Sequence, residues 1–169
     1  MKHLVKSITS VLIAISCCSL PGKGQTASIA MDITSTSAGT PVSGWKLGMQ
    51  AWSLRTLTFF DMVDTVKSLG LHYIEANTGQ KIGGGLEGTI DPAMDSGLKQ
   101  KVLDYLKQRG VKIFSIGVNV PKTTEEWEQF FAFAQSLGIR QIVSGPDPKF
   151  LPLISRLCNQ YDINVCIHN

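Results

Sequence analysis

The sequence predicts an α/β fold in which helices cover a parallel β-sheet. Apolar runs typical of strands alternate with segments whose apolar residues recur every three to four positions, as in amphipathic helices. The same boundary recurs at Gly70, Gly110 and Gly138, where a helical segment gives way to an apolar run. This alternation is typical of βαβ units with parallel strands.

About five strands and four helices are expected. Strands are predicted over residues 46–54, 71–76, 111–118, 139–144 and 163–169. Helices are predicted over residues 58–69, 94–109, 123–137 and 150–161. The third helix begins with a capping box, because Thr123 precedes Glu126 by three residues. Residues 77–93 are expected to form a long loop.

Such a chain can build either an open, doubly wound sheet or a barrel. The sequence contains neither the GxGxxG fingerprint of dinucleotide-binding sheets nor the GxxxxGK[S/T] motif of phosphate-binding loops. Because these signatures of open sheets are missing, the sequence favours a barrel.

Residues 1–25 predict a secretory signal peptide. Lys2 and Lys6 give it a basic start, and a short apolar run over residues 11–15 follows. This run is shorter than the roughly 20 apolar residues that cross a membrane as a helix. A buried N-terminal helix is the alternative, but the helix-breaking Pro21 follows soon after the run.

The processing of this signal is open between two routes. Residues 14–17, Ala-Ile-Ser-Cys, are a loose form of a bacterial lipoprotein box, whereas residues 25–30 offer small side chains for ordinary cleavage. Residues 26–44, rich in Ser, Thr, Ala and Gly, are expected to form a linker to a domain over residues 45–169. The protein is therefore expected to be exported, as a periplasmic, extracellular or lipid-anchored protein of the bacterial envelope.

The charge balance of the processed chain argues against a nucleic-acid partner. Removal of residues 1–25 takes away three of the 16 basic residues and leaves 13 basic and 13 acidic ones. A chain without excess positive charge lacks the electrostatic footprint of a nucleic-acid-binding protein.

Two cysteines, Cys158 and Cys166, lie beyond the predicted signal peptide. The first falls in a helical pattern and the second in an apolar strand, so buried free thiols are favoured over a disulfide bond. No CxxC pair or zinc-type Cys/His spacing occurs.

Three regions of the chain resemble one protein family. Residues 48–53 (GMQAWS), residues 73–76 (YIEA) with 79–84 (GQKIGG), and residues 163–169 (INVCIHN) follow one another in a familiar order and spacing. They are similar to exported sugar phosphate isomerase/epimerases of the xylose-isomerase-like TIM-barrel superfamily. The resemblance covers residues 45–169.

The resemblance implies a (β/α)8 barrel with its site at the carboxyl ends of the strands. It also implies a divalent metal ion (Mn, Mg, Co or Zn) that orients two sugar oxygens while carboxylates move a proton between neighbouring carbons. With about five strands and four helices, the chain is expected to form a partial TIM barrel. The sequence thus has the pattern of an N-terminal fragment that ends before much of the family's metal and acid/base set.

Four candidate site residues lie at strand ends, where barrel enzymes place their catalytic groups. Glu75 ends the second strand and is the candidate catalytic carboxylate, or else a salt-bridge partner. Gln50 and Trp52 end the first strand and are expected to line a sugar pocket, Trp52 by stacking on a ring, or to be core or rim residues. His168 ends the fifth strand and is the candidate metal ligand.

Further candidates lie in the loops and at the other strand ends. Gln80 and Lys81 occupy a glycine-rich loop that either contacts a phosphate group or forms a solvated lid. Asn119 and Ser144 end the third and fourth strands and are candidates for contact with sugar hydroxyl groups. His72 lies early in its strand and is expected to be structural.

The expected function is therefore a sugar isomerase or epimerase that acts by metal-assisted proton transfer on a sugar or sugar derivative. A non-catalytic carbohydrate-binding or assembly module is the alternative. A metal-dependent endonuclease is a third reading, because the superfamily includes DNA-repair enzymes, but export and the neutral charge argue against it. The expected partner is a small-molecule sugar, with membrane contact only through a lipid anchor, and homo-oligomerisation is open.

Overall fold

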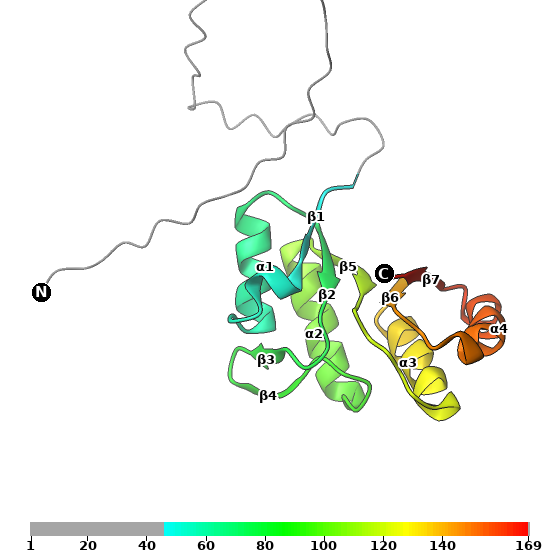
Figure 1. Cartoon of the computed structure of the whole chain (residues 1–169). Helices are drawn as coiled ribbons and strands as arrows, with labels where there is room; N and C mark the ends of the chain where they lie inside the picture. The colour runs from blue at the N-terminus through cyan, green and yellow to red at the C-terminus, as the bar shows by residue number, and fades with distance from the viewer. Residues whose placement is uncertain (1–45, 169) are drawn as a thin grey trace, which may run out of the picture. The chain divides into compact units, whose positions relative to one another are not determined.

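The computed structural model of the chain describes residues 46–168 (Figure 1). The predicted signal peptide and linker, residues 1–25 and 26–44, lie outside this range. Within it, no helix is long and apolar enough to cross a membrane.

A five-stranded parallel sheet forms the centre of the described part. Its strands, in spatial order, are β1 (Gly48–Gln50), β2 (Tyr73–Ala76), β5 (Lys112–Ile116), β6 (Gln141–Ser144) and β7 (Asn164–Ile167). Every neighbouring pair is parallel. Over residues 46–168 the sheet stays open between β1 and β7 and does not close into a barrel.

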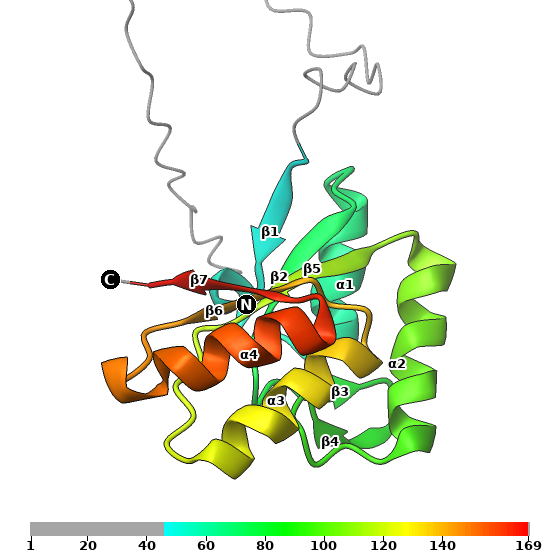
Figure 2. The ribbon, with the colours of Figure 1, turned by 90° about the vertical axis from the view of Figure 1, so that its right-hand side faces the viewer.

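Four helices cover one side of this sheet (Figures 1 and 2). They are α1 (Phe59–Ser68), α2 (Ser96–Arg109), α3 (Thr124–Ser136) and α4 (Leu151–Tyr161). The predicted α/β fold with five parallel strands and four helices is therefore confirmed. The strand-to-helix order is that of a partial TIM barrel, with the helices outside the sheet.

The core lies between the helices and the sheet. Alternate residues of the strands point into it, and Ile74, Ile116 and Ile142 are all at most 1% exposed. From the helices, Phe59 and Trp127 enter the same core and are fully buried. Burial of these side chains away from water supplies the main stabilisation of the fold.

The predicted helix boundaries agree with the structure at both kinds of end. Thr123 caps α3, and its hydroxyl oxygen accepts a hydrogen bond from the backbone N–H of Glu126 at 3.1 Å. Gly70, Gly110 and Gly138 follow α1, α2 and α3 with φ of 74°, 64° and 69°, a left-handed conformation that glycine adopts without a steric penalty.

Two predicted elements differ from the structure. The first strand was predicted to run to residue 54, but Ala51–Leu54 form a short 3₁₀ helix, η1, that buries Ala51 completely. The predicted long loop contains a hairpin of β3 (Lys81–Gly83) and β4 (Leu86–Thr89). Three consecutive glycines, residues 83–85, all have positive φ and make its turn, and Ile82 is fully buried beneath it.

A second short 3₁₀ helix, η2 (Pro148–Phe150), leads into α4.

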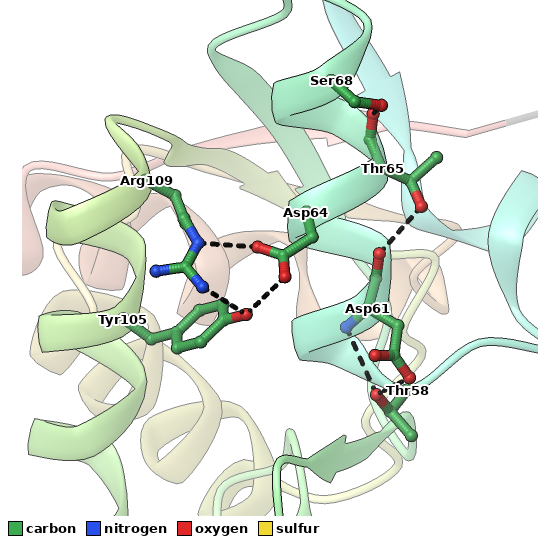
Figure 3. A network of polar contacts seen from close by, with 7 residues as sticks. All are labelled: Thr58, Asp61, Asp64, Thr65, Ser68, Tyr105 and Arg109. Carbon is green, nitrogen blue, oxygen red and sulfur yellow. Dashed lines mark hydrogen bonds and ion pairs between the residues drawn. The ribbon is translucent and has the colours of Figure 1, made fainter.

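A polar network joins α1 to α2 (Figure 3). Arg109 Nε donates to Asp64 Oδ1 at 2.7 Å, and the Tyr105 hydroxyl donates to Asp64 Oδ2 at 2.8 Å. The Tyr105 ring also stacks on Phe60, with centroids 3.7 Å apart and planes 3° from parallel. The hydrogen bond from Arg109 holds the pKa of the Asp64 carboxyl below its ordinary value.

Both described cysteines are free thiols, as the sequence indicated. Cys158 is half-buried in α4, and burial raises the pKa of its thiol. Cys166 was expected to be buried, but it is exposed. Cys166 lies in β7, the last strand of the described sheet. Side chains of a strand alternate between two faces, and only the residues that point to the helix-covered face are expected to be buried.

Candidate functional site

The candidate site lies on the sheet face opposite the helices. In β2, Ile74 and Ala76 point into the helix-covered core, so the half-buried Tyr73 and Glu75 point to the other face. Gln50 of β1 is aligned with Glu75 in the parallel pair. Polar side chains of two neighbouring strands thus meet at this point.

A bulge brings a third polar side chain to Glu75. The β2–β5 register pairs Ile74 with Ile113 and then Glu75 with Ser115, so Phe114 is the extra residue on β5. Without this shift Phe114 would stand beside Glu75. The bulge instead places the hydroxyl group of Ser115 there.

Each oxygen of the Glu75 carboxylate accepts one hydrogen bond. Gln50 Nε2 donates to Oε1 at 2.7 Å, and Ser115 Oγ donates to Oε2 at 2.9 Å. Ser115 is only 5% exposed, so its side chain is held by packing as well. Because a carboxylate has about four lone-pair positions, Glu75 is fixed in orientation and can still accept a proton or a ligand hydroxyl.

A cavity of about 270 Å³ opens beside this carboxylate. The rings of Tyr73 and Phe114 meet edge to face with centroids 6.3 Å apart, and Lys46 Nζ lies 5.5 Å from the Tyr73 centroid. The cavity therefore combines a carboxylate, an amide, a hydroxyl group, an ammonium group and aromatic surface. Its lining residues are Lys46, Gly48, Met49, Gln50, Tyr73, Ile74, Glu75, Phe114 and Ser115.

Gly48 allows the close approach of β1 to β2 along the cavity. A Cβ atom at this position would lie 2.8 Å from the carbonyl oxygen of Tyr73. Any larger residue would push the two strands apart and disturb the alignment of Gln50 with Glu75.

The polar alignment continues across the whole described sheet. Ser115 is in register with Gln141 of β6, and Gln141 with Asn164 of β7. Sequence reasoning did not identify Ser115, Gln141 or Asn164 as site residues. A signal was present, since each is a polar residue in or at the start of an otherwise apolar strand, but their alignment depends on register.

The other residues expected at the end of the first strand and in the loop after the second strand do not line this cavity. Trp52 lies on η1, is 55% exposed, and has the Arg55 guanidinium 5.0 Å from its ring centroid. Gln80 is buried and donates from Nε2 to the carbonyl oxygen of Leu57 at 3.1 Å. Lys81 is exposed on β3. None of these three lines the cavity beside Glu75.

The candidates at the later strand ends are also dispersed. Ser144 is fully buried and follows Ile142 by two residues, so it faces the helix-covered side. Asn119 lines a second cavity. His168 is exposed, and its backbone N–H donates to the carbonyl oxygen of Ser144 at 2.8 Å. His72, expected to be structural, lies with Nδ1 3.1 Å from the carbonyl oxygen of Gly110.

The described residues do not by themselves fit a divalent metal site. Over residues 46–168, no three side chains of His, Cys, Asp or Glu are grouped so that they could hold a metal ion. His168 offers a single imidazole, whereas protein metal sites generally combine several such ligands.

Comparison with known proteins finds similarity among solved structures. No protein-family model matches the chain, and no curated protein matches it in sequence. An uncharacterized protein from Parabacteroides distasonis is 33% identical, with a TM-score of 0.72 over 74% of this chain and 53% of that one.

Two further solved structures have the same fold at low sequence identity. A sugar phosphate isomerase/epimerase from Parabacteroides distasonis is 16% identical, with a TM-score of 0.52 over 77% of this chain and 53% of that one. The IolI protein with a bound zinc atom is 13% identical, with a TM-score of 0.58 over 73% of this chain and 51% of that one. The chain spans about half the length of each of these proteins. The described residues therefore have the fold of about half of a TIM barrel, as in these structural neighbours.

Proposed function

We propose that this protein is an isomerase or epimerase of a sugar or sugar derivative, and that Glu75 moves the proton. The observation that carries the proposal is the fixed carboxylate at the end of a central strand, held by Gln50 and Ser115. The fold of a sugar phosphate isomerase/epimerase among the structural neighbours supports the same reaction class.

The chemistry requires a base beside a carbon next to a carbonyl group. In the proposed reaction, an oxygen of Glu75 takes the proton from that carbon, and the C–H electrons shift to form an enediolate. Return of the proton to the neighbouring carbon, while the hydroxyl proton moves from its oxygen to the former carbonyl oxygen, gives the isomer. Protonation of the same carbon from its other face, by a second acid, gives the epimer. The hydrogen bonds from Gln50 and Ser115 keep the carboxylate oriented through both steps.

A divalent metal ion, when bound, would polarise the sugar oxygens. His168 is proposed as one of its ligands, on the basis of the family resemblance. The described residues do not complete such a site, so no step above depends on it.

The proposed substrate is a free rather than a phosphorylated sugar. The signal-like pattern of residues 1–25 supports export, and an exported enzyme meets free sugars more often than sugar phosphates. Gln80 and Lys81, the candidate phosphate contacts, do not line the cavity beside Glu75.

A carbohydrate-binding module without catalysis is the second candidate. Glu75 is the one carboxylate among the described residues that line its cavity, and epimerisation by two opposed bases needs a second. The aromatic pair of Tyr73 and Phe114 would serve a binding protein equally well, since aromatic faces pack against sugar rings.

The two candidates are separated by a turnover assay on the natural protein purified from its own cells. Neutral aldoses and ketoses are incubated with the protein and with its Glu75→Gln variant, with Mn²⁺, with Mg²⁺ and with a chelator. Conversion by the wild type and none by the variant supports the enzyme. Binding of a sugar without conversion under any of these conditions supports the binding module.

A further inference from the structure

The two ends of the described sheet differ in charge. The strands are parallel and the helices run back against them, so strand starts and helix C-terminal ends share one end of the sheet (Figures 1 and 2). This amino end comprises residues 46–48, 64–73, 105–112, 137–141 and 161–164. It carries two acidic residues and six basic ones, Lys46, Lys67, Lys107, Arg109, Lys112 and Arg140.

The opposite, carboxyl end has the reverse balance. It comprises residues 50–62, 75–101, 117–129 and 144–152, with nine acidic and six basic residues. The described part is thus nearly neutral as a whole, but its charges are segregated. A segregated charge distribution orients a protein in front of a charged partner even when the net charge is small.

The two acidic residues of the amino end are already engaged. Asp64 pairs with Arg109, and Asp162 pairs with Arg140. Within residues 46–168, the ion pairs include none of the other four basic residues of this end. These four exposed residues are Lys46, Lys67, Lys107 and Lys112.

Helix ends account for only part of this pattern. Lys67 and Lys107 lie in the last turns of α1 and α2, where a positive charge stabilises the helix dipole. Lys46 precedes β1, and Lys112 is the first residue of β5, so neither belongs to a helix. The excess of positive charge therefore extends from the helix ends onto the strand starts.

Two exposed leucines lie at the same end. Leu47 is 67% exposed and Leu69 is 58% exposed. Gly48 lines the cavity beside Glu75, so by alternation Leu47 points to the helix-covered side, where α1 ends just before Leu69. A single exposed leucine is ordinary. Exposed leucines next to unpaired lysines, however, are typical of surfaces that lie on anionic membranes.

The chain also enters the fold at this end. The described part begins at Lys46, so residues 1–45 join it at the amino end. If the loose lipoprotein box of residues 14–17 is used, the lipid would tether the domain by the same end that carries the lysines and leucines.

We propose that the amino end of the sheet lies on an anionic phospholipid surface, with the lysines at the lipid phosphates and the two leucines among the headgroups. The acidic carboxyl end then faces away from the membrane. The inference concerns the folded part itself, beyond any lipid anchor, and it holds whether or not Glu75 is catalytic.

The test is lysine labelling of the natural protein on vesicles. An amine reagent is applied in solution, with vesicles of phosphatidylcholine, and with vesicles in which about one third of the lipid is phosphatidylglycerol, and peptide mass spectrometry measures each lysine. Lys67, Lys107 and Lys112 should react about threefold more slowly or less on the anionic vesicles, and about 1 M salt should remove this protection. The comparison of two vesicle types works whether or not the protein carries a lipid.

The matched reporters are three exposed lysines of the carboxyl end. They are Lys101, Lys122 and Lys149. Their reactivity should be nearly the same on both kinds of vesicle. Equal protection of both sets of lysines would mean that the domain has no preferred orientation, and would overturn the proposal.

Paired variants test the charge. Joint replacement Lys67→Gln and Lys112→Gln should reduce the protection of the remaining Lys107 about threefold or more, since each lysine near an anionic surface adds to the attraction. Joint replacement Lys101→Gln and Lys122→Gln removes the same charge from the other end and should leave Lys107 protected. Thermal unfolding of each variant checks that the fold is kept.

A second pair of variants tests the apolar contact. Leu47→Ser with Leu69→Ser should weaken the protection of Lys107 on anionic vesicles, because the apolar surface that enters the headgroups is lost. Leu151→Ser is the control, since Leu151 is 46% exposed at the carboxyl end.

Three results would overturn the proposal. The first is no protection of the amino-end lysines on anionic vesicles, and the second is equal protection on neutral ones. The third is equal protection by heparin, a soluble polyanion, together with no effect of the leucine variants, which would indicate an acidic polymer as the partner. None of these results bears on proton transfer by Glu75, so the proposed function is tested separately.

Discussion

Ser115 donates its hydroxyl hydrogen to Oε2 of Glu75 at 2.9 Å, across two neighbouring strands and 40 positions of sequence. The contact exists because the β5 bulge moves Phe114 out of the position opposite Glu75. Ser115 is therefore proposed as a positioning residue, which fixes the carboxylate without touching the substrate.

Replacement of Ser115 by alanine should lower kcat about tenfold or more and leave KM nearly unchanged. A hydrogen bond to a charged group contributes about 1.5–3 kcal/mol, and its loss leaves Glu75 free to rotate. The measurement is steady-state kinetics on the sugar that the wild type converts. Ser115→Thr restores a hydroxyl group and should recover most of the rate. Equal rates for the alanine and threonine variants would mean that packing, not the hydrogen bond, is what matters.

The contact between α1 and α2 should be pH-dependent. Because Arg109 lowers the folded-state pKa of Asp64, the contribution of this carboxylate is present above its ordinary pKa of 3.8 and is lost as the pH falls through the lower, folded value. Asp64 and Arg109 are partly exposed, so Asp64→Asn should cost only about 0.5 kcal/mol at pH 7.

Urea unfolding of the wild type and of Asp64→Asn at pH 7 and pH 3 checks this expectation. The difference in unfolding free energy between the two proteins should shrink at pH 3. It should also shrink in 1 M salt, where the Debye screening length is about 3 Å and surface ion pairs are weakened. A difference that grows on acidification would contradict the direction of the Asp64 pKa.

Trp127 should be the most costly aromatic residue to truncate. It is fully buried, and its ring lies 6.3 Å from that of Phe131 and 6.4 Å from that of Phe150. Trp127→Ala should destabilise the fold by about 3–5 kcal/mol, measured by chemical unfolding. Trp127→Phe should cost less, since the indole N–H has no acceptor in the described structure and no hydrogen bond is lost.

The matched control is Trp52→Phe, because Trp52 is 55% exposed on η1. Its effect on stability should stay within about 0.5 kcal/mol. Similar losses of stability for Trp52→Phe and Trp127→Ala would contradict the placement of Trp127 in the core and of Trp52 at the surface.

The two described cysteines should differ in reactivity. Cys166 is exposed, whereas Cys158 is half-buried and burial raises the pKa of its thiol. Since the thiolate is the reactive form, iodoacetamide should modify Cys166 well before Cys158 in the folded protein. Peptide mass spectrometry after a short reaction measures the order. Preferential modification of Cys158 would contradict the packing of α4 against the sheet.

Most elements of the fold could be predicted because their patterns are local. The helix carrying Trp127 has a capping box and an apolar face, and both depend only on neighbouring residues. Ala51–Leu54 could not be assigned in this way, because four residues are too few to separate a 3₁₀ turn from a strand end. The β3–β4 hairpin was missed because its glycines, residues 83–85, are equally typical of a loop.

The candidate site was predictable only in part. Glu75 and Gln50 could be identified since both end strands, and parallel strands bring such residues together. Ser115 could not, because its place beside Glu75 depends on a register shift between strands far apart in sequence. Asn119 was expected at a strand end, but the sequence does not indicate that it lines a cavity separate from Glu75.

The central claim, that Glu75 moves a proton on a sugar carbon, is tested most directly by hydrogen exchange. The natural protein and its Glu75→Gln variant are incubated in D₂O with neutral ketoses and aldoses, and the sugars are examined by NMR for deuterium at the carbon next to the carbonyl group. We predict deuterium at that carbon with the wild type and none above the uncatalysed level with the variant. Absence of exchange with the wild type, or equal exchange with both proteins, would contradict the role assigned to Glu75.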